Sequence, residues 1–365
     1  MIEYNVKQGD TLRKIAVRFQ VTTVQLCYRN NMSPEACLEP GTTLFVPDAV
    51  PTDQPRGETH SGCLHEYGWR ELEEDRQSLP SSIFSEQIGI SVLGKPIWLF
   101  RAGNGPKKIF FSGAWHGNEW LNTWLLMSFL HVFISKEESK ERWYGVDPGA
   151  ILQEVTLYAV PLVNPDGVEL VQEGAHVLGK EKKNDVMQIN GGMHDFRHWS
   201  ANARGVDLNH QWPAGWKEEA AGSPDRPFPR HYGGEAPLTE PEAKAVYQLS
   251  MQEEFSHILA LHSQGEEVYW GYSGLEPPES AELGNRLAAA GSFRPVADAG
   301  SSAGYKDWFI KTFRRPGFTI ETGMGVNPLP PEASARIWIT GVPLLLESLT
   351  FPDFTKKSRD ITSAE

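Results

Sequence analysis

The sequence is poor in cysteine. Its three cysteines, Cys27, Cys37 and Cys63, are scattered along the chain and form no CxxC pair. So few and so widely spaced thiols exclude a disulfide framework, and without a CxxC pair we expect no thiolate metal site. Cys27 and Cys37 could pair with each other, or could serve as small buried apolar side chains. The sequence leaves both interpretations open.

Three further absences narrow the class of protein. No stretch approaches the roughly 18 consecutive apolar residues of a membrane span, so we expect no membrane partner. Charges at Glu3, Lys7 and Asp10 interrupt the first residues and no apolar run follows, so we expect no classical signal peptide. The net charge of −13 is opposite in sign to the basic surface of a nucleic-acid binder, which excludes nucleic acid as the main partner.

The length and the changes in composition predict two folded units. A chain of 365 residues suffices for a large core and a small module. A segment rich in proline and glycine, without apolar periodicity, is typical of a linker. We therefore predict a small module over 1–48, a linker over 49–66, a large domain over 67–352 and a polar tail over 353–365.

The first module is predicted to run strand, helix, helix, strand. Apolar residues from Leu12 to Phe19 recur with the period of an amphipathic helix. A second helix capped by Thr23 ends near Asn30, and Pro40-Gly41 turns the chain into a final strand. The pattern YxVxxGDTLxxIAxxFxV followed by PGxxLxVP resembles the LysM module, over nearly all of residues 3–47.

The LysM resemblance implies a partner. Modules of this kind bind the N-acetylglucosamine-containing glycan of peptidoglycan or chitin. It places the glycan groove between the turn that contains Asp10 and Thr11 and the loop that begins at Asn30. The sequence of the turn also fits a helix N-cap, a role that Asp10 and Thr11 can combine with ligand contacts.

The large domain alternates apolar, strand-like runs with helical stretches. The runs lie at 109–111, 156–160, 258–261 and 318–320, and the helical stretches near 120–135, 240–252 and 279–290. This alternation predicts an α/β domain with a buried, parallel or mixed sheet. Polar residues follow several of the strands directly, at the carboxyl edge where ligands bind in open α/β sheets.

The strongest chemical signal follows the first of these runs. The segment FFSGAWHGNEW presents His116 and, three residues later, Glu119. On a helical turn the two side chains share one face, so an imidazole and a carboxylate can bind one ion. Zinc accepts such ligands, and a catalytic zinc site uses three of them with a fourth position open. His262 at the end of an apolar strand, LALHS, supplies a third ligand.

Together these motifs resemble the M14 metallocarboxypeptidase family over roughly residues 67–350. The sequences NPDG, NARGVDLN and FTIE follow in the order found in the family. The resemblance implies a mixed central sheet flanked by helices and one zinc ion per chain. It also assigns roles: Glu321 as the general base that acts on the water the zinc activates, Arg204 as the stabiliser of the oxyanion, and Asp207 as the acid that orients His116.

Two departures from the family concern substrate binding. Family carboxypeptidases follow the asparagine at Asn209 with an arginine, and the pair clamps the free carboxylate of the substrate; here His210 follows. An imidazole replaces a bidentate guanidinium poorly, so the cleft is expected to accept peptides that continue. The tyrosine expected from the family is replaced by Ala299, and we consider Tyr305 as its substitute.

Lys306 stands at the position that selects the substrate side chain in the family. A lysine there favours an acidic group, since an unpaired buried ammonium is costly. We hypothesise that Lys306 holds a carboxylate of the residue after the cleaved bond. Diaminopimelate, which carries an extra carboxylate, meets this requirement.

The two parts of the chain converge on peptidoglycan as the substrate. The combination resembles the γ-D-glutamyl-L-diamino acid endopeptidases of spore-forming bacteria, which cut between γ-D-glutamate and meso-diaminopimelate. Alternatives are a carboxypeptidase acting on C-terminal residues, an amidase or deacylase of the same fold, and a wall-binding protein without activity. Without a signal peptide, we expect the protein in the cytoplasm or associated with the sporulating cell and spore, with release to the cell wall as a further option.

Overall fold

The computed structural model describes residues 2–7, 38–46, 65–297 and 302–352, together with isolated positions between them. Those isolated positions are 12, 15, 19, 26, 30, 32 and 300. The three cysteines, Asp10, Thr11 and Ala299 lie outside the described residues. The linker is also outside them, apart from residues 65 and 66.

The first module contains a two-stranded antiparallel sheet. Its strands are β1 (Ile2–Asn5) and β2 (Thr43–Val46). A small core of Val6, Leu12, Ile15, Leu26, Leu44 and Val46 packs beside them. Leu12, Ile15 and Leu26 are helical, as the apolar period predicts.

The large domain is built on one mixed sheet in the order β3-β4-β6-β5-β7-β10-β8-β9. The strands β5, β6, β7 and β10 are parallel to one another in the centre, whereas β3 and β4 on one side and β8 on the other join antiparallel. The strand bounds are β3 Phe84–Ile90, β4 Pro96–Ala102, β5 Lys107–Ser112, β6 Val155–Val160, β7 His257–His262, β8 Glu267–Tyr269, β9 Arg294–Val296 and β10 Gly317–Glu321.

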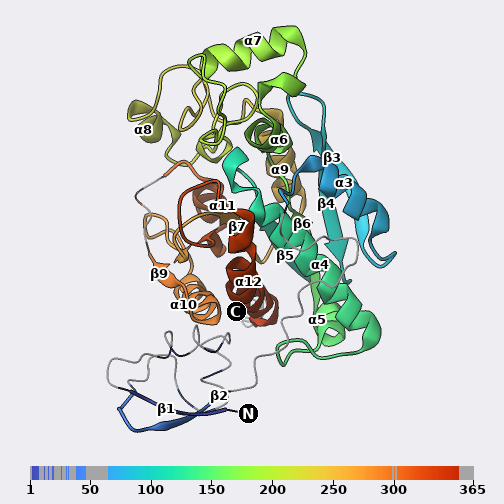
Figure 1. Ribbon diagram of the computed structural model, residues 1–365, viewed down its shortest axis with the longest axis vertical. Coiled ribbons are helices and arrows are strands. Elements are labelled where there is room, and N and C mark those ends of the chain that lie inside the picture. Colours follow the sequence, from blue (N-terminus) through green and yellow to red (C-terminus); the bar gives the residue numbers. More distant parts are fainter. Residues whose placement is uncertain are drawn as a thin grey trace, which may run out of the picture.

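Helices cover both faces of this sheet. The α-helices are α3 Trp69–Ser78, α4 Leu121–Ser139, α5 Pro148–Glu154, α6 Pro165–Glu173, α7 Lys180–Ile189, α8 Trp216–Ala221, α9 Pro241–Gln252, α10 Glu279–Gly291, α11 Tyr305–Phe313 and α12 Ser334–Thr350. Short 3₁₀ turns are η1 Gly117–Glu119, η2 Ala175–Val177, η3 Leu208–His210 and η4 Pro331–Ala333. Figure 1 shows α6, α7 and α8 gathered beyond one end of the central strands.

The central strands divide their side chains between two cores. In β5, Ile109 and Phe111 belong to the core beneath α4 and α12, whereas Phe110 belongs to the core beneath α9 and α11. The same alternation continues in β6 and β7. Since both faces are covered, these strands read as continuous apolar runs in the sequence. The predicted α/β class and the mixed sheet flanked by helices are confirmed.

One polar side chain lies buried at the opposite end of β7 from the predicted ligand. His257 is fully buried, and one ring nitrogen lies 2.8 Å from the hydroxyl of Ser348 on α12. Burial, with the nearby Lys107 ammonium, lowers the pKa of His257 well below the usual value of 6.5. In the folded protein the imidazole is therefore neutral over a pH range where the unfolded chain binds a proton.

His257 is predicted to make the fold sensitive to acid. The free energy of unfolding should fall as the pH drops below about 6.5, by up to about 1.4 kcal/mol per pH unit from this group, until the folded pKa is reached. His257→Gln should remove this contribution, whereas the exposed His176→Gln should not. Urea unfolding at about pH 8 and about pH 5.5 measures the difference. Parallel pH curves for wild type and His257→Gln would refute this role.

Candidate metal centre

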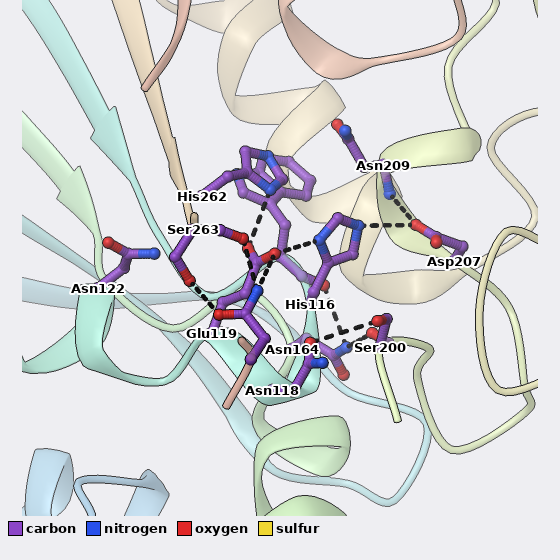
Figure 2. A network of polar contacts seen from close by, with 12 residues as sticks. His116, Asn118, Glu119, Asn122, Asn164, Ser200, Asp207, Asn209, His262 and Ser263 are labelled. Carbon is purple, nitrogen blue, oxygen red and sulfur yellow. Dashed lines mark hydrogen bonds and ion pairs between the residues drawn. The ribbon is translucent and has the colours of Figure 1, made fainter. Parts of the chain in front are cut away.

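His116, Glu119 and His262 converge, although one lies more than a hundred residues from the others. The Nδ1 atom of His116 lies 2.9 Å from one Glu119 oxygen, and Nδ1 of His262 lies 3.1 Å from the other. A ligand atom from each residue lies within 4.8 Å of those of the other two. Figure 2 shows the three side chains pointing toward one another. Two imidazole nitrogens and a carboxylate oxygen are a donor set that suits zinc.

The loop after β5 is held in place by an asparagine from a neighbouring loop. Asn164 caps α6 by accepting a hydrogen bond from the Gly167 backbone N–H at 2.9 Å. Its amide nitrogen also donates to the carbonyl oxygen of Trp115, the residue before His116, at 3.1 Å. Asn164 is fully buried and appears beside the ligands in Figure 2. The asparagine of the NPDG motif thereby fixes the path of the backbone between the end of β5 and His116.

Close backbone packing explains a glycine in the HGNE motif. A Cβ atom on Gly117 would lie 2.5 Å from the carbonyl oxygen of Gly167, so any side chain would force η1 away from α6. The Gly117 N–H also donates to the Ser200 carbonyl oxygen at 3.0 Å. The backbone between the two candidate ligands His116 and Glu119 is therefore restricted on both sides.

Asp207 contacts the first histidine of the group. One of its carboxylate oxygens lies 3.1 Å from Nε2 of His116, which leaves Nδ1 of that ring facing Glu119. Burial opposes ionisation of Asp207, but the rings of His116 and His210 and the backbone N–H of His231 hold its pKa well below the usual value. A carboxylate that accepts the far N–H of a ligand histidine fixes its tautomer and raises its basicity.

The pKa values of the neighbouring carboxyl groups of Glu119 and Glu321 shift in opposite directions. Burial would raise the pKa of Glu119, but the two imidazoles lower it to about 2. Glu321, partly buried at the end of β10, pairs in register with His262 on β7. Burial and then the Glu119 carboxylate raise the pKa of Glu321 well above its usual value. One carboxyl is suited to binding a cation and the other to exchanging protons.

Side chains that the sequence did not single out tie these strand ends together. Thr322, next to Glu321, donates its hydroxyl proton to Asn122 at 2.8 Å. The amide of Asn327 donates to the Ser263 carbonyl oxygen at 2.6 Å and accepts from the Ser263 hydroxyl at 3.0 Å. Asn327 lies beyond the strand that carries Glu321, and Ser263 follows the ligand His262. No sequence motif marks this contact, since the two residues are 64 positions apart.

Comparison with known proteins places the chain in a family. Residues 70–338 match the model of the zinc carboxypeptidase family, and residues 4–47 match the LysM domain. The chain belongs to the zinc carboxypeptidase family. Family membership implies a zinc ion and a metallopeptidase domain, in agreement with the donor set described above.

Two relatives and one solved structure resemble the chain over most of its length. Gamma-D-glutamyl-L-diamino acid endopeptidase 1 of Lysinibacillus sphaericus is 43% identical over 262 residues, which cover 72% of this chain and 66% of that protein. The uncharacterized protein YqgT of Bacillus subtilis is 39% identical over 73% of this chain and 71% of its own length. The crystal structure of thrombin activatable fibrinolysis inhibitor shares the fold, with a TM-score of 0.63 and 16% identity over 86% of this chain and 89% of that one.

The other residues named from the family pattern lie in the loop that carries Asp207 and just after it. The Arg204 side chain is 54% exposed, and its guanidinium lies 3.4 Å from the Glu240 carboxylate. Asn209 donates its backbone N–H to Asp207 at 3.1 Å, and its side-chain oxygen accepts from the Tyr305 backbone N–H at 3.4 Å. His210 is largely buried, with Nδ1 3.8 Å from a carboxylate oxygen of Glu219.

Tyr305 does not replace the missing family tyrosine. Its side chain is fully buried, and its hydroxyl lies 2.8 Å from the Ser250 hydroxyl on α9. The ring stacks on Trp115 with centroids 5.2 Å apart. The expectation was wrong because Tyr305 begins an amphipathic helix and lies on its apolar face, directed into the core.

Lys306 is buried, but its ammonium is not unpaired. It donates to the Gly271 carbonyl oxygen at 2.7 Å and forms an ion pair with the adjacent Asp307. Asp307 in turn accepts the Gly304 backbone N–H at the start of α11. The expectation that the Lys306 ammonium is buried without a counter-ion is therefore wrong. A substrate carboxylate would have to compete with Asp307 for Lys306.

In the LysM module, Asn30 has a structural role. Its amide nitrogen donates to the carbonyl oxygens of Leu26 and Phe45, at 2.7 and 2.9 Å, and its oxygen accepts the Phe45 N–H at 2.8 Å. These bonds join the end of a helix to β2. Asn30 is therefore needed to shape the module, and glycan binding by this residue stays a prediction.

The Lys306–Asp307 pair provides a stability prediction. Lys306→Met should cost about 3 to 5 kcal/mol of unfolding free energy, because it leaves Asp307 buried without a counter-ion. The double variant Lys306→Met/Asp307→Asn should recover much of this loss, since asparagine can still accept the Gly304 N–H. Urea unfolding compares the three proteins. A single variant as stable as wild type would show that the ion pair is unimportant.

Proposed function

We propose that this chain is a zinc-dependent endopeptidase that cuts peptidoglycan stem peptides between γ-D-glutamate and meso-diaminopimelate. The observation that carries the proposal is the union, on one chain, of the His116–Glu119–His262 site with a LysM domain. The relative at 43% identity bears the name of such an endopeptidase, which supports the same bond.

The residues would share the chemistry as follows. A zinc ion held by His116, Glu119 and His262 would polarise the scissile carbonyl and lower the pKa of water. Glu321 takes the proton from the attacking water and returns it to the leaving amine, a double role that its raised pKa favours. Asp207 keeps His116 in the tautomer that binds metal through Nδ1.

Arg204 supplies a fixed positive charge for the developing oxyanion. Its ion pair with Glu240 restricts the side chain while half of its surface stays open to solvent. The backbone of its loop is held by Asn202, whose side-chain oxygen accepts the Arg204 N–H at 3.0 Å. A guanidinium placed before the reaction stabilises negative charge without reorganisation.

The binding groups favour a peptide that continues past the cleaved bond. His210 occupies the position of the family's clamp arginine and faces Glu219, so a free C-terminal carboxylate gains no bidentate partner there. The LysM domain would retain the enzyme on the glycan strand and raise the local concentration of stem peptides. We propose the cell wall or the spore as its place of action.

Muropeptide digestion tests the bond. A purified disaccharide tetrapeptide should yield a disaccharide dipeptide ending in D-glutamate and the dipeptide meso-diaminopimelyl-D-alanine, both identifiable by mass spectrometry. An amidated C-terminus should be tolerated. Release of D-alanine alone would identify a carboxypeptidase instead, and release of the intact peptide from the sugar would identify an amidase.

Glu321→Gln tests the base. Loss of the proton acceptor should lower kcat by about 100-fold or more, whereas zinc retention measured by elemental analysis should not change, because Glu321 is not one of the three ligands. The matched control is Glu267→Gln, since Glu267 is the neighbour of Glu321 across the sheet and pairs with Arg294. If Glu321→Gln kept the activity of wild type, as the control is expected to, Glu321 would not be the general base.

A further inference from the structure

A second group of potential metal ligands lies beside the first. A ligand atom from each of Asp207, His210 and His231 lies within 4.8 Å of those of the other two. The rings of His210 and His231 are 5.6 Å apart between centroids. None of the three belongs to the group formed by His116, Glu119 and His262. The composition is nevertheless the same, with two imidazoles and one carboxylate.

Two separate loops are joined to build this group. Asp207 caps η3, and the His210 backbone N–H donates to the Asp207 carbonyl oxygen at 3.0 Å. The loop that contains His231 packs beside Asp207, where the backbone N–H of His231 donates to an Asp207 carboxylate oxygen at 2.9 Å. The Asp207 N–H also donates to the Tyr232 carbonyl oxygen at 2.7 Å. The three side chains are therefore fixed relative to one another by backbone contacts.

The backbone of His231 has an unfavourable conformation. Its φ of +67° lies in the left-handed region, which is unfavourable for a residue other than glycine. Strain of this kind concentrates at functional sites, where surrounding contacts maintain it. Here the hydrogen bond from the His231 N–H to Asp207 does so.

Some of the donor atoms are free to bind a ligand. Nδ1 of His210 is buried and has no hydrogen-bond partner among the described residues. The Asp207 oxygen that accepts the His231 N–H has a second lone pair. An unsatisfied buried nitrogen destabilises the fold, and a bond to a metal ion would satisfy it. His231 is exposed, so an ion could enter from solvent.

The charges select a cation. The Asp207 carboxylate lies at the centre of the group, and the Glu219 carboxylate lies 3.8 Å from Nδ1 of His210. Two carboxylates repel an anion, and two imidazoles favour a borderline divalent ion over calcium or magnesium. We propose that Asp207, His210 and His231 form an accessory site for a divalent cation of the zinc type.

The two sites would share one carboxylate. One Asp207 oxygen accepts from His116, a ligand of the first group, and the other accepts from the His231 backbone. Figure 2 shows Asp207 on the side of His116 that faces away from Glu119. Because Asp207 serves both groups, substituting it would disturb both. The test therefore uses the histidines.

Metal stoichiometry tests the proposal. The full chain, depleted of metal and then dialysed against increasing Co²⁺, should bind two equivalents by elemental analysis, each adding to the visible d–d absorbance. His210→Gln and His231→Asn should each bind one. Asparagine is chosen at 231 because it tolerates a positive φ, and the remaining equivalent reports that the first site is intact. The control His194→Gln, at an exposed histidine outside the group, should bind two.

Two results would overturn the proposal. Wild type that binds a single equivalent throughout the titration would show that the group does not hold a cation. A second equivalent that persists in both His210→Gln and His231→Asn would place the additional ion elsewhere on the chain. Neither result bears on the peptidase function, which depends on the first group of ligands.

Discussion

The parallel alignment of β5, β7 and β10 is the constraint on which the site depends. Glu321 and His262 are direct partners in the register of β10 and β7, and Ser112 at the end of β5 pairs with Ala260. Neighbouring parallel strands end at the same edge of a sheet. The polar residues that follow these strands therefore lie close together. His116, four residues past the end of β5, reaches the same point through a tightly held loop.

Buried polar side chains convert this meeting of strand ends into a defined geometry. Asn164 fixes the backbone before His116, and Asp207 fixes the ring of that histidine. Both are almost fully removed from solvent, where a satisfied hydrogen bond is strong and an unsatisfied group is costly. The network therefore restricts the candidate ligands to one arrangement, which favours binding of an ion in one geometry.

Much of the fold, and the convergence of the first group of potential metal ligands, could be predicted from the sequence. The central strands are continuous apolar runs because both faces are covered, and their ends carry the ligands. The short strands β8 and β9 at one side of the sheet gave no comparable signal, since each has only three residues and, apart from Val268, these are partly buried or exposed. Tyr305 was misplaced because the distance along the chain from a family motif does not show which face of a helix a residue occupies.

Pairing between side chains was the main feature that the sequence could not provide. The Lys306 ammonium was expected to be unpaired until a substrate carboxylate binds. In the structure it forms an ion pair with the adjacent Asp307. His231 lies in a loop without periodicity, 24 residues from Asp207, and only the folded backbone brings the two together. Such contacts depend on the paths of loops, which neither apolar period nor composition determines.

We propose that His116, Glu119 and His262 hold the ion on which hydrolysis depends. Anomalous scattering at the zinc absorption edge, from crystals of zinc-loaded protein, tests it directly. We expect a strong peak within bonding distance of Nδ1 of His116, the Glu119 carboxylate and Nδ1 of His262. Loaded, active crystals without a peak at these three side chains would contradict it.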